Sequence, residues 1–229
     1  MKLFIDTGSV AEVEEIAAWG VLAGATTNPT LLAKEGGDPG ETLRRICDLV
    51  DGPVSAEVVA ADAAGMIEQG RALYGLHEHI VVKTPFSPAG LEAAHALSED
   101  EIPVNMTLVF TASQALLAAE AGATFVSCFM GRLDDVSIDS GETLQGIVEA
   151  LHTGQSVAAV LAASIRSPQH AVLAARLGCE VATIPAKVLR QMLDHPLTTA
   201  GTERFTSDWR SRPELGEWMS RLVDGAAVR

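Results

Sequence analysis

Lys83 stands at the end of an apolar run, in the segment His79-Ile-Val-Val-Lys-Thr-Pro85. An amine that follows a buried strand is desolvated, which disfavours its ammonium form. A neutral amine attacks carbonyl carbons and forms a Schiff base. The alternative is a lysine that reaches towards solvent or pairs with a carboxylate. The segment alone does not separate these two interpretations.

Other polar residues also stand where apolar runs end. Side chains alternate faces along a strand, so polar residues two apart at a strand end share one face. The residues at or near such ends are Asp6, Thr26, Asn28, Glu57, Lys83, Asn105, Thr107, Ser127, Ser164 and Arg166. A Schiff-base enzyme needs carboxylates for proton transfer, amides or hydroxyls for substrate hydroxyls, and cations for a phosphate. All three kinds of group are present, which favours a functional site.

The elements that must position these residues are short apolar runs that alternate with helical stretches along the whole chain. We predict eight strands, at Lys2–Asp6, Ala23–Thr27, Val54–Val58, Ile80–Lys83, Val104–Val109, Thr124–Phe129, Ala158–Ala163 and Glu180–Ile184. Eight strand–helix units without a break in composition indicate a parallel (β/α)8 barrel formed by a single domain, residues 1–229. A doubly wound open sheet is the alternative, but no GxGxxG or GxxxxGK follows a strand.

Helix start and stop signals lie between the predicted strands. Ser9-Val-Ala-Glu12 has the pattern of a capping box, in which the serine oxygen and the glutamate bond to free backbone N–H groups. Its helix should stop near Gly20. Thr111-Ala-Ser-Gln114 repeats the pattern. Ser167-Pro168 supplies an N-cap and a first-turn proline, and Gly178 is expected to end that helix.

The segment 211–229 lies outside the repeat and is predicted to be a C-terminal helical extension. Pro213 suits the first helical position, and Glu214 suits the positive end of the helix dipole. An apolar stripe at i, i+3, i+4 and i+7 spacing consists of Leu215, Trp218, Met219 and Leu222. We therefore expect an amphipathic helix that covers another surface.

Composition excludes several classes of function. The net charge of −14 opposes binding to nucleic acid. No apolar stretch approaches eighteen residues, so no membrane span is expected. We expect a cytoplasmic protein, because no secretory signal opens the chain and its three cysteines are few, odd in number and far apart. The six histidines form no metal-binding motif, and no metal is expected.

Taken together, these segments resemble the transaldolase family. The matching segments, in the family's order, are Phe4-Ile-Asp-Thr7, Ala25-Thr-Thr-Asn-Pro-Thr30, Gly52-Pro-Val-Ser-Ala-Glu57, Val81-Val-Lys-Thr-Pro85, Asn105-Met-Thr107, Gly131-Arg-Leu-Asp-Asp135, Ala163-Ser-Ile-Arg166 and Ala182-Thr-Ile-Pro185. They cover the chain to about Trp209. The compact length is similar to that of the small transaldolases and of the fructose-6-phosphate aldolases.

The resemblance implies the catalytic roles. Lys83 would form the Schiff base, and Asp6 would be the general acid and base at the substrate's hydroxyls. Glu57 and Thr107 would hold the water that relays protons. The implied reaction needs no cofactor and converts sedoheptulose 7-phosphate and glyceraldehyde 3-phosphate into erythrose 4-phosphate and fructose 6-phosphate. The resemblance also implies a homo-oligomer, a pentamer or decamer, assembled through the C-terminal helices.

The resemblance further implies a set of substrate-binding residues. Asn28, Asn105 and Ser127 would bind the dihydroxyacetone moiety. Arg132, Ser164 and Arg166 would hold the sugar phosphate through charge-assisted hydrogen bonds. Thr26 and Phe129 complete the expected set. The alternative for Arg132 is an ion pair with Asp134 or Asp135.

The main competing function is that of an aldolase with the same fold, which releases free dihydroxyacetone. The residues that separate the two are Glu57, Ser127 and Phe129, where the aldolases tend to carry glutamine, alanine and tyrosine. This chain has the transaldolase-like residue at each position. A non-catalytic phosphosugar-binding barrel is a remoter alternative, which the retained lysine and carboxylates oppose. Cys128 and Thr84 depart from the family pattern, and alternation predicts that both point away from the barrel axis.

Overall fold

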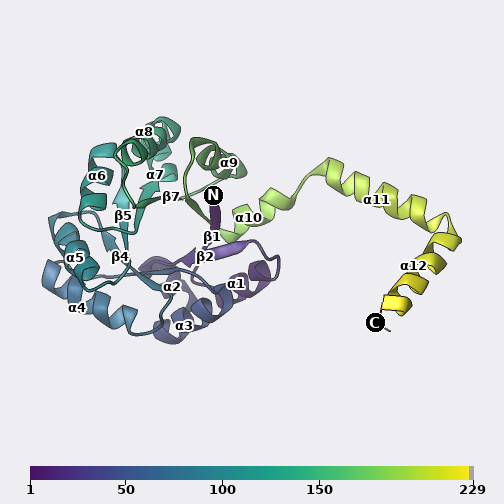
Figure 1. Cartoon of the computed structure of the whole chain (residues 1–229), viewed down its shortest axis with the longest axis horizontal. Helices are drawn as coiled ribbons and strands as arrows, with labels where there is room; N and C mark the ends of the chain where they lie inside the picture. The colour runs from purple at the N-terminus through teal and green to yellow at the C-terminus, as the bar shows by residue number, and fades with distance from the viewer. Residues whose placement is uncertain (227–229) are drawn as a thin grey trace. The chain divides into compact units, whose positions relative to one another are not determined.

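The computed structural model describes residues 1–226 and contains a closed barrel of eight parallel strands, each paired with the next in chain order (Figure 1). The strands are β1 (Lys2–Asp6), β2 (Leu22–Thr26), β3 (Val54–Glu57), β4 (Ile80–Pro85), β5 (Val104–Val109), β6 (Phe125–Phe129), β7 (Ala159–Ala163) and β8 (Val181–Ile184). Pairing of β1 with β8 closes the barrel. The predicted (β/α)8 fold is confirmed, and every predicted strand overlaps an observed one.

Helices follow the strands and surround the barrel. Those of the repeat are α1 (Val10–Ala17), α2 (Pro29–Glu35), α3 (Pro39–Val50), α4 (Ala63–Tyr74), α5 (Pro88–Glu99), α6 (Ala112–Glu120), α7 (Met130–Asp135), α8 (Ser140–Thr153), α9 (Pro168–Leu177) and α10 (Ala186–Leu193). Thr111 caps α6 by accepting a hydrogen bond from the Gln114 N–H, and Ser167 caps α9 through the His170 N–H. Gly178 ends α9 in the left-handed conformation, as predicted.

The start of α1 differs from the expected capping box. Ser9 is the N-cap residue, but its side chain makes no capping hydrogen bond. The Thr7 hydroxyl accepts from the Ser9 N–H at 3.1 Å and donates to Glu12 at 2.6 Å. The prediction for the serine oxygen was therefore wrong. The Ser9 N–H, which the capping box assigns to the Glu12 carboxylate, bonds to the Thr7 hydroxyl instead. The helix ends at Ala17, three residues before Gly20.

Two apolar layers hold the barrel together. The outer layer lies between the sheet and the helices, where strand residues such as Ile5 pack with helix residues such as Ile16. The inner layer fills the barrel with strand side chains alone, and its buried members are Phe4, Leu161, Ala163 and Val181. Gly24 leaves room for this packing, since a Cβ there would lie 2.4 Å from the Phe4 ring.

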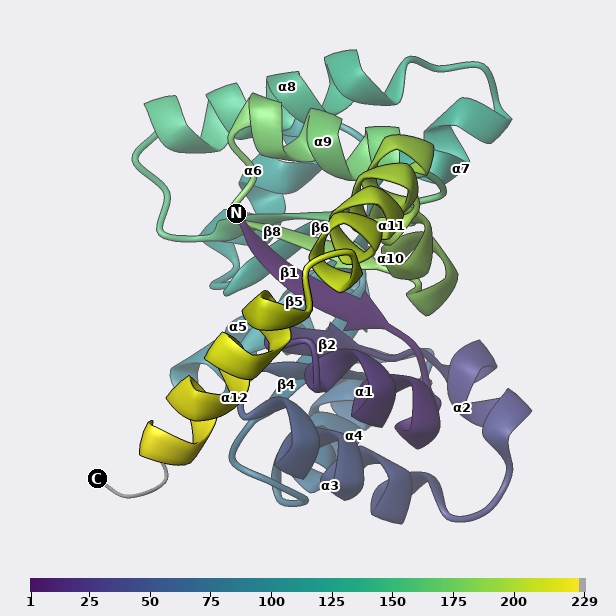
Figure 2. The same cartoon turned by 90° about the vertical axis from the view of Figure 1, so that its right-hand side faces the viewer.

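The chain divides into two compact units, Met1–Leu189 and a second that begins at Arg190. Besides the end of α10, the second unit contains α11 (Pro196–Arg210) and α12 (Pro213–Ala226), which Figure 2 shows as two successive helices. The Trp209 and Trp218 rings lie 6.4 Å apart between them. The C-terminal helix predicted within 211–229 is present from Pro213 to Ala226, and positions 227–229 of that prediction lie outside the described residues. Its stripe is exposed, for example 47% at Trp218 and 50% at Leu222.

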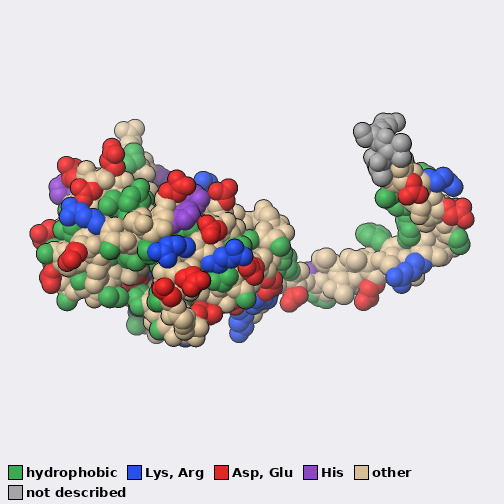
Figure 3. Space-filling model, turned by 90° about the horizontal axis from the view of Figure 1, so that it is seen from below, with side chains coloured by type: hydrophobic (Ala, Val, Ile, Leu, Met, Phe, Trp, Pro, Cys, Tyr) green, Lys and Arg blue, Asp and Glu red, His purple; other side chains and the backbone are tan. Residues whose placement is uncertain are grey.

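Charged side chains of both signs are scattered over the face of the barrel unit seen in Figure 3. Such mixing fits a solvated surface better than a field that gathers one kind of charged ligand. Within residues 1–226, none of the helices has both the length and the apolar character needed to cross a bilayer.

Candidate active site

Two neighbouring cavities, of about 410 and 140 Å³, lie at the carboxyl ends of the strands. They share Asn28, Lys83, Phe129 and Arg132 in their walls. The predicted site residues that line at least one of them are Asp6, Thr26, Asn28, Glu57, Lys83, Asn105, Thr107, Ser127, Phe129, Arg132 and Ser164. Parallel strands bring their ends together at one face of a barrel, so residues far apart in sequence meet here. Of the predicted residues, Arg166 alone is outside these walls.

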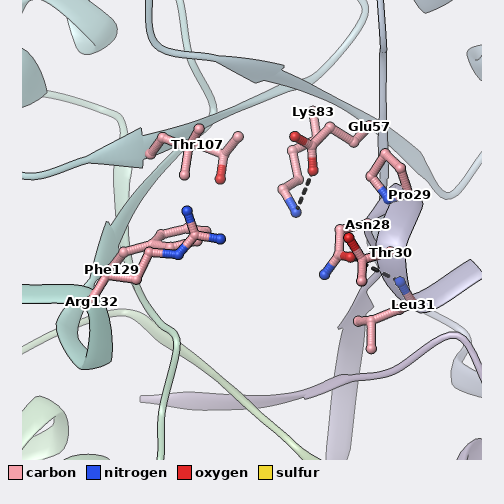
Figure 4. A pocket seen from close by; sticks show the side chains of 10 residues that line it. Asn28, Pro29, Thr30, Leu31, Glu57, Lys83, Thr107, Phe129 and Arg132 are labelled. Atoms are coloured by element: carbon pink, nitrogen blue, oxygen red, sulfur yellow. Dashed lines mark hydrogen bonds and ion pairs between the residues drawn. The ribbon is translucent and has the colours of Figure 1, made fainter. Parts of the chain in front are cut away.

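Lys83 is buried in the larger cavity with 5% of its surface exposed. Its Nζ donates to the Thr27 carbonyl oxygen at 2.9 Å and lies 3.0 Å from Glu57 Oε2 (Figure 4). The parallel register pairs Glu57 with Lys83 across β3 and β4. Burial and carboxylate pairing, which the sequence presented as alternatives, therefore occur together. A base that can take the lysine proton is within hydrogen-bonding distance.

Asp6 receives a chain of two hydrogen bonds. The Thr26 hydroxyl donates to Asp6 Oδ1 at 2.8 Å and lies 2.6 Å from the Thr183 hydroxyl. Because Thr26 uses its proton on Asp6, Thr183 must be the donor to Thr26. Burial raises the pKa of Asp6, against the lowering effects of the Thr26 hydrogen bond and of the Lys83 charge. A carboxyl group with a raised pKa is suited to proton transfer near neutral pH.

The Asn105 side chain is fixed at both ends of its amide. Its Nδ2 donates to Ser55 Oγ at 3.0 Å, and Ser127 Oγ donates to its Oδ1 at 2.6 Å. All three side chains are buried. The remaining Nδ2 hydrogen and Oδ1 lone pair are still available to a ligand. This network gives the amide one orientation before any ligand arrives.

Thr107 and Asn28 complete the wall around Lys83. The buried Thr107 hydroxyl has no hydrogen-bond partner among the described residues, so it can bond to the contents of the cavity. Asn28 also has a structural role, because its Oδ1 caps α2 by accepting from the Leu31 N–H at 2.9 Å. Figure 4 shows the Asn28 amide nitrogen on the cavity side.

Arg132 supplies positive charge on the opposite side of the cavity from Asn28 (Figure 4). Its guanidinium carbon lies 5.1 Å from the centre of the Phe129 ring, a cation–π arrangement. Asp134 and Asp135, the alternative ion-pair partners predicted for Arg132, have other partners among the described residues. Asp134 lies 3.2 Å from His170 Nε2, and Asp135 pairs with Arg166.

Arg166 follows β7 and is turned to the outside of the cavities. Both of its terminal nitrogens bond to the two carboxylate oxygens of Asp135. Ser164, two residues earlier, adopts a left-handed backbone with φ of 56°, and its carbonyl oxygen accepts the Gly131 N–H at 3.1 Å. This turn redirects the chain between the Ser164 wall position and Arg166.

Several residues of the site are absent from the predicted set, among them the wall residues Pro29, Thr30, Leu31 and Ala163. Three others affect the geometry of the site. Ser55 and Thr183 are interior-facing and support Asn105 and the Thr26–Asp6 pair. Alternation could have found Ser55, which stands two residues before Glu57 and therefore shares its face. Leu108 lines the larger cavity with φ of 62°, at an irregularity in the pairing of β5 with β6. No simple sequence signal marks that backbone.

A closed (β/α)8 barrel with a polar site at the carboxyl ends of its strands has the architecture of the barrel enzymes. A family model described as "Transaldolase/Fructose-6-phosphate aldolase" matches residues 3–222, and the chain belongs to this family of aldolase-type enzymes.

Similar proteins include three bacterial relatives, each named "Probable transaldolase". One relative from Thermus thermophilus is 52% identical over 218 residues, which cover 91% of this chain and 98% of that protein. The relative from Brevibacillus brevis is 52% identical over 92% of this chain and 99% of its own length. The relative from Clostridium acetobutylicum is 50% identical over 92% and 98%, respectively.

Proposed function

We propose that this protein is a transaldolase that transfers a dihydroxyacetone unit between sugar phosphates through a Schiff base on Lys83. The observation that carries the proposal is the pairing of the buried Lys83 amine with Glu57 at 3.0 Å, in the wall of a cavity of about 410 Å³. The substrates would be sedoheptulose 7-phosphate and glyceraldehyde 3-phosphate, and the products erythrose 4-phosphate and fructose 6-phosphate.

The first half of the reaction builds the Schiff base. Glu57 takes a proton from the Lys83 ammonium, and the neutral amine attacks the ketone carbon of the donor sugar. Loss of water from the carbinolamine then gives the iminium ion. Protons move through a water molecule held by Glu57 and Thr107, whose hydroxyl needs a partner in the cavity.

The second half breaks and remakes a carbon–carbon bond. Asp6 removes the proton of the hydroxyl next to the bond to be cleaved, and the electrons of that bond flow into the iminium ion. The aldose phosphate leaves, and dihydroxyacetone remains on Lys83 as an enamine. An acceptor aldose phosphate then reverses these steps, with Asp6 returning the proton. The raised pKa of Asp6 supports this role, since it makes the carboxylate a stronger base.

Phe129 favours transfer over release of dihydroxyacetone. Release requires protonation of the enamine carbon, which an acidic hydroxyl in the wall would promote. Phe129 has no such hydroxyl, and the chain's single tyrosine, Tyr74, lies in α4 and packs against the outer apolar layer. The enamine therefore persists until an acceptor arrives.

Two measurements test this proposal. Borohydride with fructose 6-phosphate, followed by peptide mapping, should label Lys83; a label elsewhere, or none, rejects the mechanism. A coupled assay should show fast formation of glyceraldehyde 3-phosphate only when erythrose 4-phosphate is present. Phe129→Tyr should raise acceptor-independent release, whereas Phe110→Tyr, on the ring packed edge-on against Phe129, should not. Cleavage that is equally fast without an acceptor would identify an aldolase instead.

We also propose that α12 is an assembly element of a pentamer or decamer. Its exposed stripe, with Met219 at 43% and Leu222 at 50%, supports a role in covering another copy of the chain. Truncation after Arg212 should lower the number of subunits per particle, calculated from the mass measured by light scattering. An unchanged number of subunits would mean that α12 does not contribute to assembly.

A further inference from the structure

The ion pair between Arg166 and Asp135 occupies both terminal nitrogens of the guanidinium group, which together form its fork. Both terminal nitrogens meet both carboxylate oxygens, the bidentate geometry with which arginine also binds phosphate. The two side chains are about half-exposed, at 49% and 50%. Asp135 is the last residue of α7, and Arg166 follows β7, so the pair joins two neighbouring loops at the top of the barrel.

The Arg166 side chain also packs closely against α7. A Cβ at Gly131 would lie 2.5 Å from Arg166 Nε and 2.9 Å from its Cδ, so this part of the side chain fits only against a glycine. An arginine has two edges that can bind an anion bidentately, the fork and the Nε edge. Here Asp135 occupies the first, and Gly131 packs beside Nε. In this arrangement Arg166 lies outside the walls of the cavities.

The charged residues of the short helix α7 differ in their partners. Arg132 faces the cavity and takes part in no ion pair of the described residues, whereas Asp134 has His170 as its partner and Asp135 has Arg166. A phosphate at Arg132 would meet one accessible cation nearby. A second cation becomes available only when Asp135 gives up Arg166.

We propose that Asp135 is a positioning residue, which pairs with Arg166 before substrate binds. When substrate binds, its phosphate replaces the Asp135 carboxylate on Arg166. The carboxylate occupies the fork until a stronger multidentate anion displaces it, so Asp135 sets the anion affinity of the site. A phosphate dianion, with three acceptor oxygens, competes better for the fork than a monoanionic carboxylate does. Asp135 therefore favours phosphorylated sugars over sugar acids. This inference rests on the proposed phosphate-binding role of Arg166.

The charge of Asp135 persists under working conditions. The Arg166 hydrogen bonds hold the pKa of Asp135 below its ordinary value, and the nearby Arg132 charge acts in the same direction. Asp135 is thus ionised throughout the neutral range and competes with substrate at every working pH. If Asp135 only oriented Arg166, its removal would have the opposite effect. The Arg166 side chain would become more mobile, and phosphate binding would weaken.

The test measures inorganic phosphate as a competitive inhibitor, together with KM for fructose 6-phosphate. Asp135→Asn should lower both constants roughly two- to fivefold, the factor expected for losing one half-exposed competing ion pair. The effect should fall on KM rather than on kcat. Asp134→Asn removes the same charge one residue away, where the partner is His170, and should leave both constants near the parent values. Unchanged or weaker phosphate binding by Asp135→Asn would overturn the proposal.

Arg166→Ala separates this proposal from the proposed function. If phosphate inhibits Arg166→Ala as strongly as the parent, Arg166 does not bind phosphate and the present inference fails, while Schiff-base trapping at Lys83 remains a separate test. If Arg166→Ala loses phosphate affinity, the double variant Asp135→Asn/Arg166→Ala decides. It should show no gain over Arg166→Ala. An equal gain without Arg166 would mean that Asp135 acts only by repelling anions, and would also overturn the inference.

Discussion

The interior of the barrel has two levels that are built by the same strands. At the lower level, β1 contributes Phe4 and β6 contributes Phe125, whose rings meet edge-on with centres 6.0 Å apart. Two residues further along, the same strands contribute Asp6 and Ser127 to the site. Interior-facing positions two apart are separated by about 6.6 Å along a strand. One such step changes the interior from a packed core to a polar site.

The two levels contribute oppositely to stability. Burying an apolar side chain of the size of Leu161 contributes about 1.5–3 kcal/mol. Burying Asp6, Lys83 and Asn105 costs free energy, which the surrounding hydrogen bonds and the Glu57 ion pair offset. The lower level therefore holds the barrel closed, and the upper level carries polar and charged groups that a packed core would exclude. Variants at each level should therefore change different properties.

The largest expected effect is on activity, at the upper level. Lys83→Ala should lower transfer by at least about a thousandfold, because the covalent nucleophile is lost. It also leaves Glu57 without its cation, so the free energy of unfolding should fall unless that carboxyl is neutralised. Lys83→Ala/Glu57→Gln should regain the lost stability and no activity. Near-normal transfer by Lys83→Ala would show that Lys83 is not the covalent nucleophile.

The next effect is on stability, at the lower level. Leu161→Ala should lower the free energy of unfolding by about 2–5 kcal/mol, because it opens a cavity in the inner apolar layer. Its folded fraction should keep kcat within a few-fold of the parent. Leu116→Ala, at a position 44% exposed on α6, is the control and should be nearly neutral in urea denaturation. If Leu161→Ala lost activity but kept its stability, this would contradict the assignment of stability to the lower level and activity to the upper level.

A smaller, pH-dependent effect is expected at Asp6. Burial raises its pKa above the ordinary value of 3.8, so the folded state binds this proton more tightly than the unfolded state does. The ionised carboxylate therefore costs stability as the pH rises through the folded pKa, and the cost vanishes below the unfolded pKa. Asp6→Asn should be inactive yet raise the Tm by about 2–4 °C at pH 7. As the pH falls towards and below 3.8, where the unfolded state also binds this proton, the gain in Tm should shrink towards zero. A gain that stays equal over this range would contradict the sign.

The smallest effect is expected at Thr183, the outer donor of the chain that reaches Asp6 through Thr26. Thr183→Val weakens the support of the carboxylate, so the pH at which activity rises should move upwards by less than about one unit. Stability should change by about 1 kcal/mol. Thr84→Val is the control, because Thr84 bonds to the Met106 sulfur on the opposite face of the sheet. A shift of equal size in both variants would rule out the Thr183 chain.

Much of the fold could be predicted because periodicity is a local property. The strand positions, the Thr111 and Ser167 caps and the α12 stripe each depend on residues close together in sequence. The alternation of side chains along a strand also predicted correctly that Cys128 points away from the barrel axis, since it packs in the outer apolar layer. The positions of Asp6, Glu57 and Lys83 at the ends of strands are also local features of the sequence. They predicted that these residues would meet, and all three line the two adjoining cavities.

The partners of those residues could not be predicted in this way. A lone Ser55 or Thr183 inside a strand carries no distinctive pattern, and its role arises only when the closed barrel brings another strand opposite. The direction of Arg166 depends on Asp135, 31 residues earlier in the chain, and on the absence of a side chain at Gly131. The bond between the Thr7 hydroxyl and the Ser9 N–H, in place of the predicted bond from Glu12, depends on the geometry of a single turn.

Helix α11 has no buried residue, and Leu197 and Phe205 on it are 76% and 73% exposed. A helix of 15 residues that buries none of its side chains gains little stability from packing and is marginally stable in water. Its amide hydrogens should therefore exchange with deuterated solvent orders of magnitude faster than those of the barrel strands, whose opening requires unfolding of the core. Slow exchange along α11, measured at concentrations where the protein assembles and lost on dilution, would locate the surface that a neighbouring copy covers.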